Sequence, residues 1–282
     1  MFASDALTPP ILRPSVASIN NPRATAGLLK RGYPLKAFAL FMAFNCGILS
    51  PAAQDQKQNE IARVESVFTG RSLSEINLAL AAMLPEAVSQ TDKSVLMREL
   101  PLVNAHNRVE GGQKLIRLYA RVETTLKLYK RHGIVDLVIF RDSRPIVYSK
   151  PGVVLVISTE VLKIVGSDDA ALSGVVAHEL AHEYVAMQML SAIRAGDLSK
   201  IRELELFCDA VAVVVLLDLG LDPAHYGKAL KRIATHSQAA AALNDGSDSH
   251  PAIAARLKII SDVSDLLRSQ ISFPPTLVTH CR

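Results

Sequence analysis

The pattern HExxH, at residues 178–182, carries the clearest chemistry in this sequence. On a helix, residues four apart lie on one face, so the imidazoles of His178 and His182 can bind one metal ion. Glu179, beside the first histidine, can take a proton from an activated water molecule. The alternative is two surface histidines beside a solvated glutamate. The long apolar run around the motif disfavours it, because polar groups buried in such a run need a partner such as a metal ion.

A catalytic zinc ion takes three protein ligands and keeps a fourth position open, so we expect one Zn²⁺ and a third ligand. No glutamate occurs after Glu205, and Glu205 and Asp209 share a helix face four residues apart. We predict that Glu205 binds the metal and that Asp209 accepts a hydrogen bond from a ligand histidine. Two alternatives stay open. Cys208 could replace Glu205 as the ligand, or both carboxylates could belong to a solvated helix face.

A tetrahedral oxyanion formed by attack on a peptide carbonyl needs a hydrogen-bond donor besides the metal. His250 is the candidate donor, because it stands directly before Pro251 at a predicted junction between a loop and a helix. From the sequence alone, a histidine at that place also fits a simple helix start. His225 and His236 have no supporting motif, and we expect them on the surface of their helix.

Mostly helical elements are predicted around these residues. Apolar residues recur every three or four positions between 112 and 131, which indicates an amphipathic helix. Two short apolar runs indicate strands at 135–140 and 153–157. Capping and turn residues delimit further helices at 56–68, 74–83, 170–194, about 199–219, 223–236 and 251–269. The expected fold class is therefore α+β and mainly helical, with a small β-sheet and an active-site helix.

The composition excludes several classes of protein. Hydrophobic residues make up 49% of the 282 residues and charged residues 21%, which excludes a disordered chain. Tryptophan is absent and aromatic residues are 5%, so a base-stacking surface is not expected. The formal charge of +4 arises entirely within residues 1–53, and the rest of the chain holds 26 basic and 26 acidic residues. We therefore expect no nucleic-acid partner.

The first 53 residues have the pattern of a targeting segment. Basic residues precede an uncharged apolar run at 37–49, and small residues follow at 50–53. This order is typical of a secretory signal peptide, which predicts a periplasmic or secreted protein. An uncleaved signal anchor, which would tether the protein to a membrane, and a mitochondrial presequence are the alternatives. Residues 54–109 form a helical N-terminal extension without a chemical motif.

The ordered motifs resemble the M48 family of zinc metallopeptidases, within the gluzincins. The resemblance covers about residues 110–270 and places the peptidase domain at 110–282. It follows a set of pieces in order: a helix, two strands around Pro151-Gly152, the segment LSGVVAHELAH at 172–182, an ExxxD segment ELFCD at 205–209, the turn GLDP at 220–223, and an HPxxxxR element from His250 to Arg256. The 22 residues between His182 and Glu205 leave room for little more than a helical hairpin.

The resemblance implies a zincin-like core in which His178, His182 and Glu205 bind zinc and Glu179 is the general base. It places His250 near the metal and gives Arg256 a supporting role. It implies a zinc metalloendopeptidase that hydrolyses extended or misfolded protein segments, in the cell envelope if the signal is used. A zinc-containing binding or chaperone-like module is the alternative function. It further implies that one strand binds the peptide substrate by strand addition, here Val153, Val154, Leu155, Val156 and Ile157.

Overall fold

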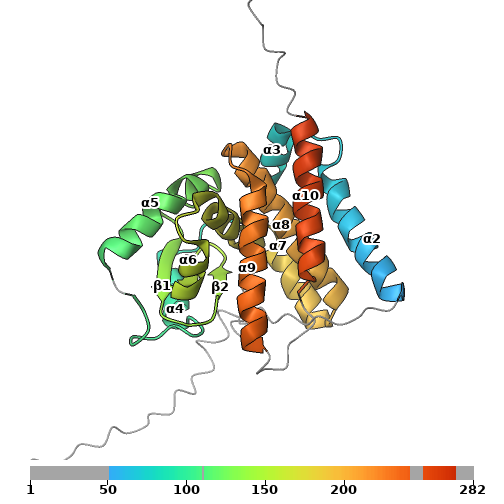
Figure 1. Ribbon diagram of the computed structural model, residues 1–282. Helices are drawn as coiled ribbons and strands as arrows, with labels where there is room; N and C mark the ends of the chain where they lie inside the picture. Colours follow the sequence, from blue (N-terminus) through green and yellow to red (C-terminus); the bar gives the residue numbers. More distant parts are fainter. Residues whose placement is uncertain (1–50, 110, 242–249, 271–282) are drawn as a thin grey trace, which may run out of the picture. The chain divides into compact units, whose positions relative to one another are not determined.

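The computed structural model describes residues 51–109, 111–241 and 250–270 (Figure 1). The described chain is mainly helical and contains one three-stranded sheet, which confirms the predicted fold class at that level. No helix in these ranges combines the length and hydropathy needed to span a membrane. The elements follow in the order α2 (Pro51–Phe68), α3 (Leu73–Met83), α4 (Gln90–Arg98), α5 (Gly112–Leu128), β1 (Asp136–Phe140), β2 (Val147–Lys150), β3 (Val154–Ser158), α6 (Thr159–Val165), α7 (Asp169–Ala195), α8 (Leu198–Asp218), α9 (Pro223–Ala241) and α10 (Ile253–Gln270).

Helices α7 and α8 form a hairpin at the centre of the helical part. Asp168 caps the start of α7 by accepting a hydrogen bond from the backbone N–H of Ala171 at 2.9 Å. Gly196 ends α7 in a left-handed conformation that permits the short turn into α8. Helices α9 and α10 cover this hairpin on one side, and α2 and α5 contact it as well (Figure 1). The hairpin agrees with the short spacing between the two motif segments.

The sheet has the order β1-β3-β2, with β1 parallel and β2 antiparallel to β3. Residues 153–157, predicted to add a substrate strand, therefore lie in the middle of the sheet and have partners on both sides. A peptide cannot pair with a strand whose two edges are occupied. The choice of strand was wrong, and its side chains are completely buried. Among the described strands, β2 has an outer edge that no other strand pairs with.

Two helical segments differ from the sequence prediction. Helix α4 was not expected, because its sequence is polar and lacks an apolar stripe; it begins at Ser89, whose hydroxyl accepts the N–H of Asp92. Helix α5 ends at Leu128 instead of continuing to 131, because Lys130 takes a left-handed conformation (φ 54°). The N–H of Arg131 then donates to the carbonyl of Leu126, which closes the helix end.

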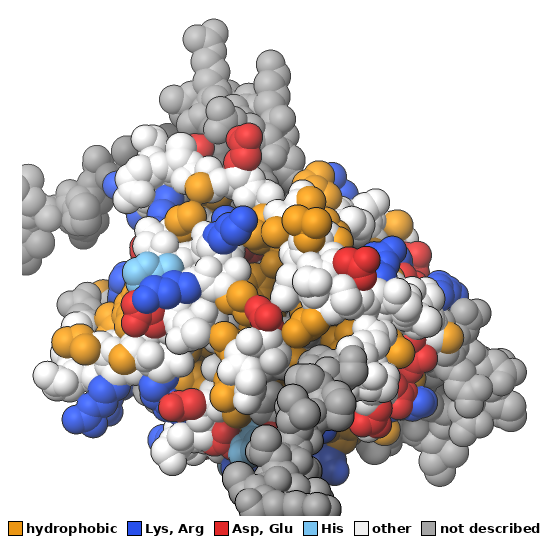
Figure 2. Space-filling view, turned by 90° about the horizontal axis from the view of Figure 1, so that it is seen from above, with side chains coloured by type: hydrophobic (Ala, Val, Ile, Leu, Met, Phe, Trp, Pro, Cys, Tyr) orange, Lys and Arg blue, Asp and Glu red, His pale blue; other side chains and the backbone are white. Residues whose placement is uncertain are grey.

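The described surface carries charges of both signs. In Figure 2, blue and red side chains are spread over the same face, with hydrophobic side chains between them. This mixture agrees with the equal numbers of basic and acidic residues beyond position 53. The predicted signal segment at 1–53 lies outside the described residues except for its last three positions, at the start of α2.

Candidate metal centre

Helices α7 and α8 bring His178, His182 and Glu205 together. The two histidines stand one turn apart on α7, and Glu205 faces them from α8. Nε2 of His178 lies 3.4 Å from one carboxylate oxygen of Glu205, and Nε2 of His182 lies 3.7 Å from the other. One ligand atom from each residue lies within 4.8 Å of the others. His178 and Glu205 are only 3% and 6% exposed, and the side chain of His182 is 16% exposed, so the group is buried but reached by solvent at His182.

These separations fit a shared metal ion. Tetrahedral zinc with bonds of about 2.0–2.1 Å holds its ligand atoms about 3.3 Å apart. The observed spacings are close to that value and longer than an ordinary N–H···O hydrogen bond. Two imidazoles and one carboxylate also form a donor set that zinc takes in catalytic sites. The described residues therefore fit one metal ion bound by the three predicted ligands.

Cys208 lies behind the ligand group. Its Sγ is 3.6 Å from Nδ1 of His182, the ring nitrogen that faces away from Glu205. It does not belong to the group of donor atoms that could share an ion. The thiol is completely buried, and burial raises its pKa well above the usual value. Cys208 therefore supports the ring of His182 and is not placed as a ligand.

Asp209 lies where the sequence predicted, against His178. Its Oδ1 is 2.9 Å from Nδ1 of His178, which leaves Nε2 of that ring for a metal ion. Arg256 donates from Nε to Oδ2 at 2.7 Å and from Nη2 to Oδ1 at 2.6 Å. The hydroxyl of Tyr226 donates to the same Oδ1 at 2.6 Å. Asp209, Arg256 and Tyr226 are all completely buried, so each depends on these bonds.

Tyr226 is a member of this network that the sequence did not reveal. It lies on α9, and its ring rests against α7 at Gly174, where any larger residue would meet the ring. No motif or helical spacing links position 226 to Asp209. The proximity of a glycine on α7 and a tyrosine on α9 arises only from the packing of the two helices.

The charges around the site favour the neutral form of His182 but the protonated form of His178, so a metal ion would have to displace a proton from His178. Burial opposes the charged form of His178, but the carboxylate of Asp209 outweighs it and raises the pKa of His178 to about 9. Burial lowers the pKa of His182 to about 4, so its imidazole is neutral, as a ligand must be. Burial would raise the pKa of Asp209, but the guanidinium of Arg256 lowers it to about 2. For Glu205, nearby histidines outweigh burial and lower the pKa well below its usual value.

Glu179 lies beside the ligand group with the properties of a proton acceptor. It is 5% exposed, and burial raises its pKa to about 7, near the pH at which a general base works best. Glu179 and His178 line a small cavity of about 10 Å³, which is room for about one water molecule. The remaining walls come from β2, α6, α7, α9 and α10, and are mostly apolar.

His250 lies close enough to the centre for its charge to act on Glu205, and burial lowers its pKa. The other two histidines of this region lie elsewhere. His225 pairs with Asp168 at the start of α7, with 2.7 Å between Nδ1 and Oδ2. His236 bonds to a carbonyl of its own helix. These positions agree with the resemblance, which favoured His250 over His225 and His236, and the role of His250 stays a prediction.

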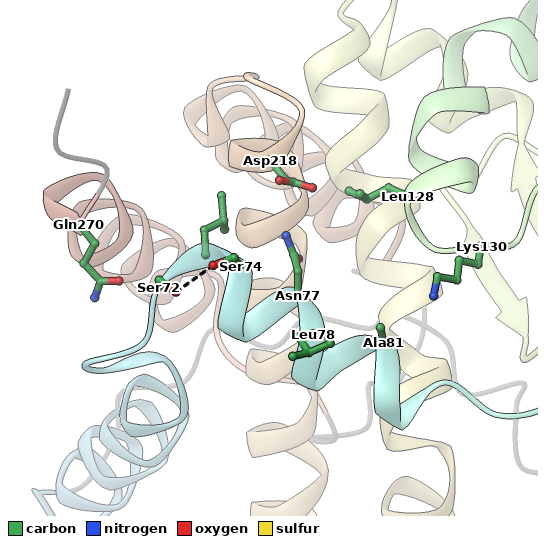
Figure 3. Close-up of a pocket in the computed structure, with 10 residues that line it drawn as sticks. Ser72, Ser74, Asn77, Leu78, Ala81, Leu128, Lys130, Asp218 and Gln270 are labelled. Atoms are coloured by element: carbon green, nitrogen blue, oxygen red, sulfur yellow. Dashed lines mark hydrogen bonds between the residues drawn. The ribbon is translucent and has the colours of Figure 1, made fainter. Parts of the chain in front are cut away.

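A larger, open cavity of about 730 Å³ lies at the other end of α8 (Figure 3). Its labelled side chains come mainly from α3, with Lys130, Asp218 and Gln270 around them. Asp218 is 13 residues beyond Glu205 on the same helix, a distance of about 20 Å along the axis. None of the residues of the candidate metal centre lines this cavity.

No protein-family model matches the chain, and the comparison with curated proteins found no match. The interpretation of the site therefore depends on its own geometry and on the order of its motifs.

Proposed function

We propose that this protein is a zinc-dependent metallopeptidase similar to the M48 gluzincins. The observation that carries the proposal is the buried group of His178, His182 and Glu205 with Glu179 beside it. The donor atoms lie within 4.8 Å of one another, close enough to share one ion, and burial raises the pKa of the neighbouring Glu179 carboxyl to about 7. A purely structural metal site has no use for such a base, whereas hydrolysis requires one.

Each residue of the site has a defined task in peptide hydrolysis. Zinc held by the two histidines and Glu205 would lower the pKa of water and polarise the substrate carbonyl. Glu179 accepts a proton from the attacking water and returns it to the leaving nitrogen. Asp209 fixes the ring of His178 through Nδ1. His250 donates a hydrogen bond to the oxyanion that forms at the carbonyl.

The outer edge of β2 is the proposed binding site for the substrate backbone. The N–H of Ser158 donates to the carbonyl of Ile146. In the antiparallel pair of β2 and β3, residues whose backbone groups face the partner strand alternate with residues whose backbone groups face away, counting from Ile146. The backbone groups of Val147 and Ser149 consequently point away from β3. An extended peptide can pair with them by strand addition. The hydroxyl of Ser149 donates to the carbonyl of Glu179 at 2.7 Å, which puts this edge beside the general base.

The proposed substrate class comes from the resemblance to the M48 family, and pairing with β2 agrees with it. Only a chain segment free to adopt an extended conformation can pair with β2, so the proposed substrates are unfolded or misassembled proteins.

The sequence of residues 1–53 supports export, and we propose a periplasmic or secreted location. Mass spectrometry of the mature N-terminus tests this: removal of about 53 residues is expected, and an intact N-terminus in a membrane fraction would instead indicate an anchor.

Hydrolysis of reduced, unfolded casein tests the proposed activity. We expect cleavage by the zinc-loaded protein, loss of cleavage after chelation, and recovery with about one equivalent of zinc per chain. Magnesium is the matched control, because a site of two imidazoles and one carboxylate does not suit it. Stoichiometric zinc binding without cleavage of any unfolded substrate would contradict the enzyme and favour the binding module.

A further inference from the structure

The edge strand β2 is held from both of its faces. Side chains alternate along a strand, so Val147 and Ser149 point to one face and Tyr148 and Lys150 to the other. On the first face, Val147 lines the cavity beside Glu179, and Ser149 bonds to the carbonyl of Glu179. The second face meets a different part of the chain, the N-terminal extension, which has no chemical motif of its own.

Lys150 and Tyr148 make three hydrogen bonds to that extension. Nζ of Lys150 donates to the carbonyls of Leu96 at 3.0 Å and Glu99 at 2.8 Å. These carbonyls lie at the end of α4, where a helix leaves carbonyls without partners and carries partial negative charge. The hydroxyl of Tyr148 donates to the carbonyl of Pro101 at 2.6 Å. Lys150 is only 6% exposed, so its ammonium group depends on these carbonyls.

A second buried lysine joins α4 to β1, at the edge of the sheet opposite β2, and is separate from the three bonds that hold β2. Nζ of Lys93, a residue of α4, donates to the carbonyl of Ile134 and pairs with Asp136 of β1 at 2.9 Å. Lys93 is 8% exposed and therefore about as buried as Lys150. The segment thus contacts β1 through one lysine and β2 through another, on opposite sides of the central strand.

We propose that residues 96–101 act as a clamp that positions β2 for the substrate, with Lys150 and Tyr148 as its positioning residues. This inference rests on the proposed function, because it assigns the N-terminal extension a task in peptide binding. A four-residue edge strand with a partner on one side only loses order easily. A strand held in advance binds a peptide with a smaller entropic cost, so the clamp acts on substrate affinity.

The test compares Lys150→Met with Lys93→Met, which removes an equally buried ammonium group from the same contact region. For an unfolded substrate, Lys150→Met is expected to raise KM about tenfold, with kcat changed less than about threefold. Lys93→Met is expected to leave KM within about twofold, even if it lowers the melting temperature as much. Zinc content should stay unchanged in both. Equal effects of the two variants on KM would overturn the proposal.

Amide hydrogen exchange tests the clamp without relying on catalysis. Lys150→Met is expected to speed exchange at residues 146–150 by at least about tenfold relative to Lys93→Met. Tyr148→Phe, which removes one hydroxyl, should also speed exchange at residues 146–150, to a smaller degree. It replaces Lys150→Met in the experiment if that variant does not fold. If the native protein cleaves nothing, the proposed function fails while the exchange result still decides on the clamp. Exchange of β2 that is unchanged in both clamp variants would refute it.

Discussion

At the scale of single residues, Asp209 links His178, a proposed metal ligand, to Arg256 and Tyr226. Asp209→Asn keeps the shape but removes the charge that faces a buried guanidinium. We expect zinc affinity to fall about 10- to 100-fold, because the carboxylate orients the ligand ring. We also expect a loss of about 3–5 kcal/mol in the free energy of unfolding. Titration with a competing zinc chelator and urea denaturation measure the two effects.

Asp218→Asn is the matched control, since Asp218 lies on the same helix but is exposed. It should change neither the free energy of zinc binding nor the free energy of unfolding by more than about 0.5 kcal/mol. Wild-type zinc affinity in Asp209→Asn would show that Asp209 does not orient His178.

The sequence predicted the residues whose positions follow from helical spacing. HExxH places two imidazoles on one face of α7, and the four-residue step from Glu205 to Asp209 places one carboxylate at the ligands and the next behind His178. Cys208, one position before Asp209, consequently lies behind His182. Tyr226 was missed because it arrives from another helix, and no spacing rule connects it with the motif.

At the scale of helices, the close contact of α7 with α9 depends on Gly174. A Cβ at this position would lie 2.5, 2.6 and 2.8 Å from Cβ, Cγ and Cδ2 of the buried Tyr226 side chain. We expect Gly174→Ala to lower the free energy of unfolding by about 1–3 kcal/mol through overpacking. It should also weaken zinc binding, because the displaced ring pulls its hydroxyl from Asp209.

Gly227→Ala on α9 is the control, since a Cβ there meets only one atom of a leucine side chain, at 3.3 Å. The gain in helix propensity, about 1 kcal/mol, offsets that contact. Thermal denaturation of the two variants distinguishes them. A Gly174→Ala protein as stable as Gly227→Ala would contradict the packing argument.

The N-cap of α7 gives a pH-dependent prediction. Burial opposes the charge of Asp168, but the N–H of Ala171 and the neighbouring His225 outweigh it and lower the pKa. The stability that this charge provides is therefore present above the unfolded pKa of about 4 and is lost as the pH falls through the folded pKa. Asp168→Ala should cost about 1 kcal/mol at pH 7.

Urea denaturation at pH 7 and pH 3 checks this prediction. The difference between wild type and Asp168→Ala should shrink at pH 3. Asp168→Asn should retain most of the cap at pH 7, because its amide oxygen can accept the same N–H. A difference that grows toward low pH would contradict the sign of the shift.

Sequence patterns predicted the long elements better than the short ones. The ends of α7 carry a capping aspartate and a glycine, and the observed bounds follow them closely. The apolar run of β3 was recognised as a strand but assigned to the substrate, although a strand apolar on both faces is typical of a sheet centre. β2 and α4 have four and nine residues and mixed polarity, so their positions depend on contacts distant in sequence.

At the scale of the whole molecule, metal binding should stabilise the fold. The proposed ligands join α7 to α8, and an ion that binds only the folded chain adds about 4 kcal/mol at a concentration 1,000 times its Kd. Chelation should therefore lower the melting temperature by several degrees. Calorimetry with and without zinc measures this change. Glu205→Gln should show a much smaller response to zinc, and an equal response would place the ion elsewhere.

Export is also a property of the whole chain, and it stays a prediction from sequence. The excess positive charge and the apolar run both lie within residues 1–53, almost entirely outside the described residues. The described buried side chains of α2, from Glu60 to Phe68, all lie beyond this segment, so its removal would leave them in place.

The most direct test of the central claim is the cleavage rate of Glu179→Gln at the same zinc content as the native protein. The variant keeps the three ligands and changes one oxygen of the side chain to an amide nitrogen. We predict full zinc binding and a kcat lower by about 10²- to 10⁴-fold, the usual contribution of a general base. Glu160→Gln, half-buried on α6 and paired with Lys163 outside the ligand group, should keep the native rate. A zinc-loaded Glu179→Gln protein that cleaves at the native rate would contradict peptide hydrolysis at this site.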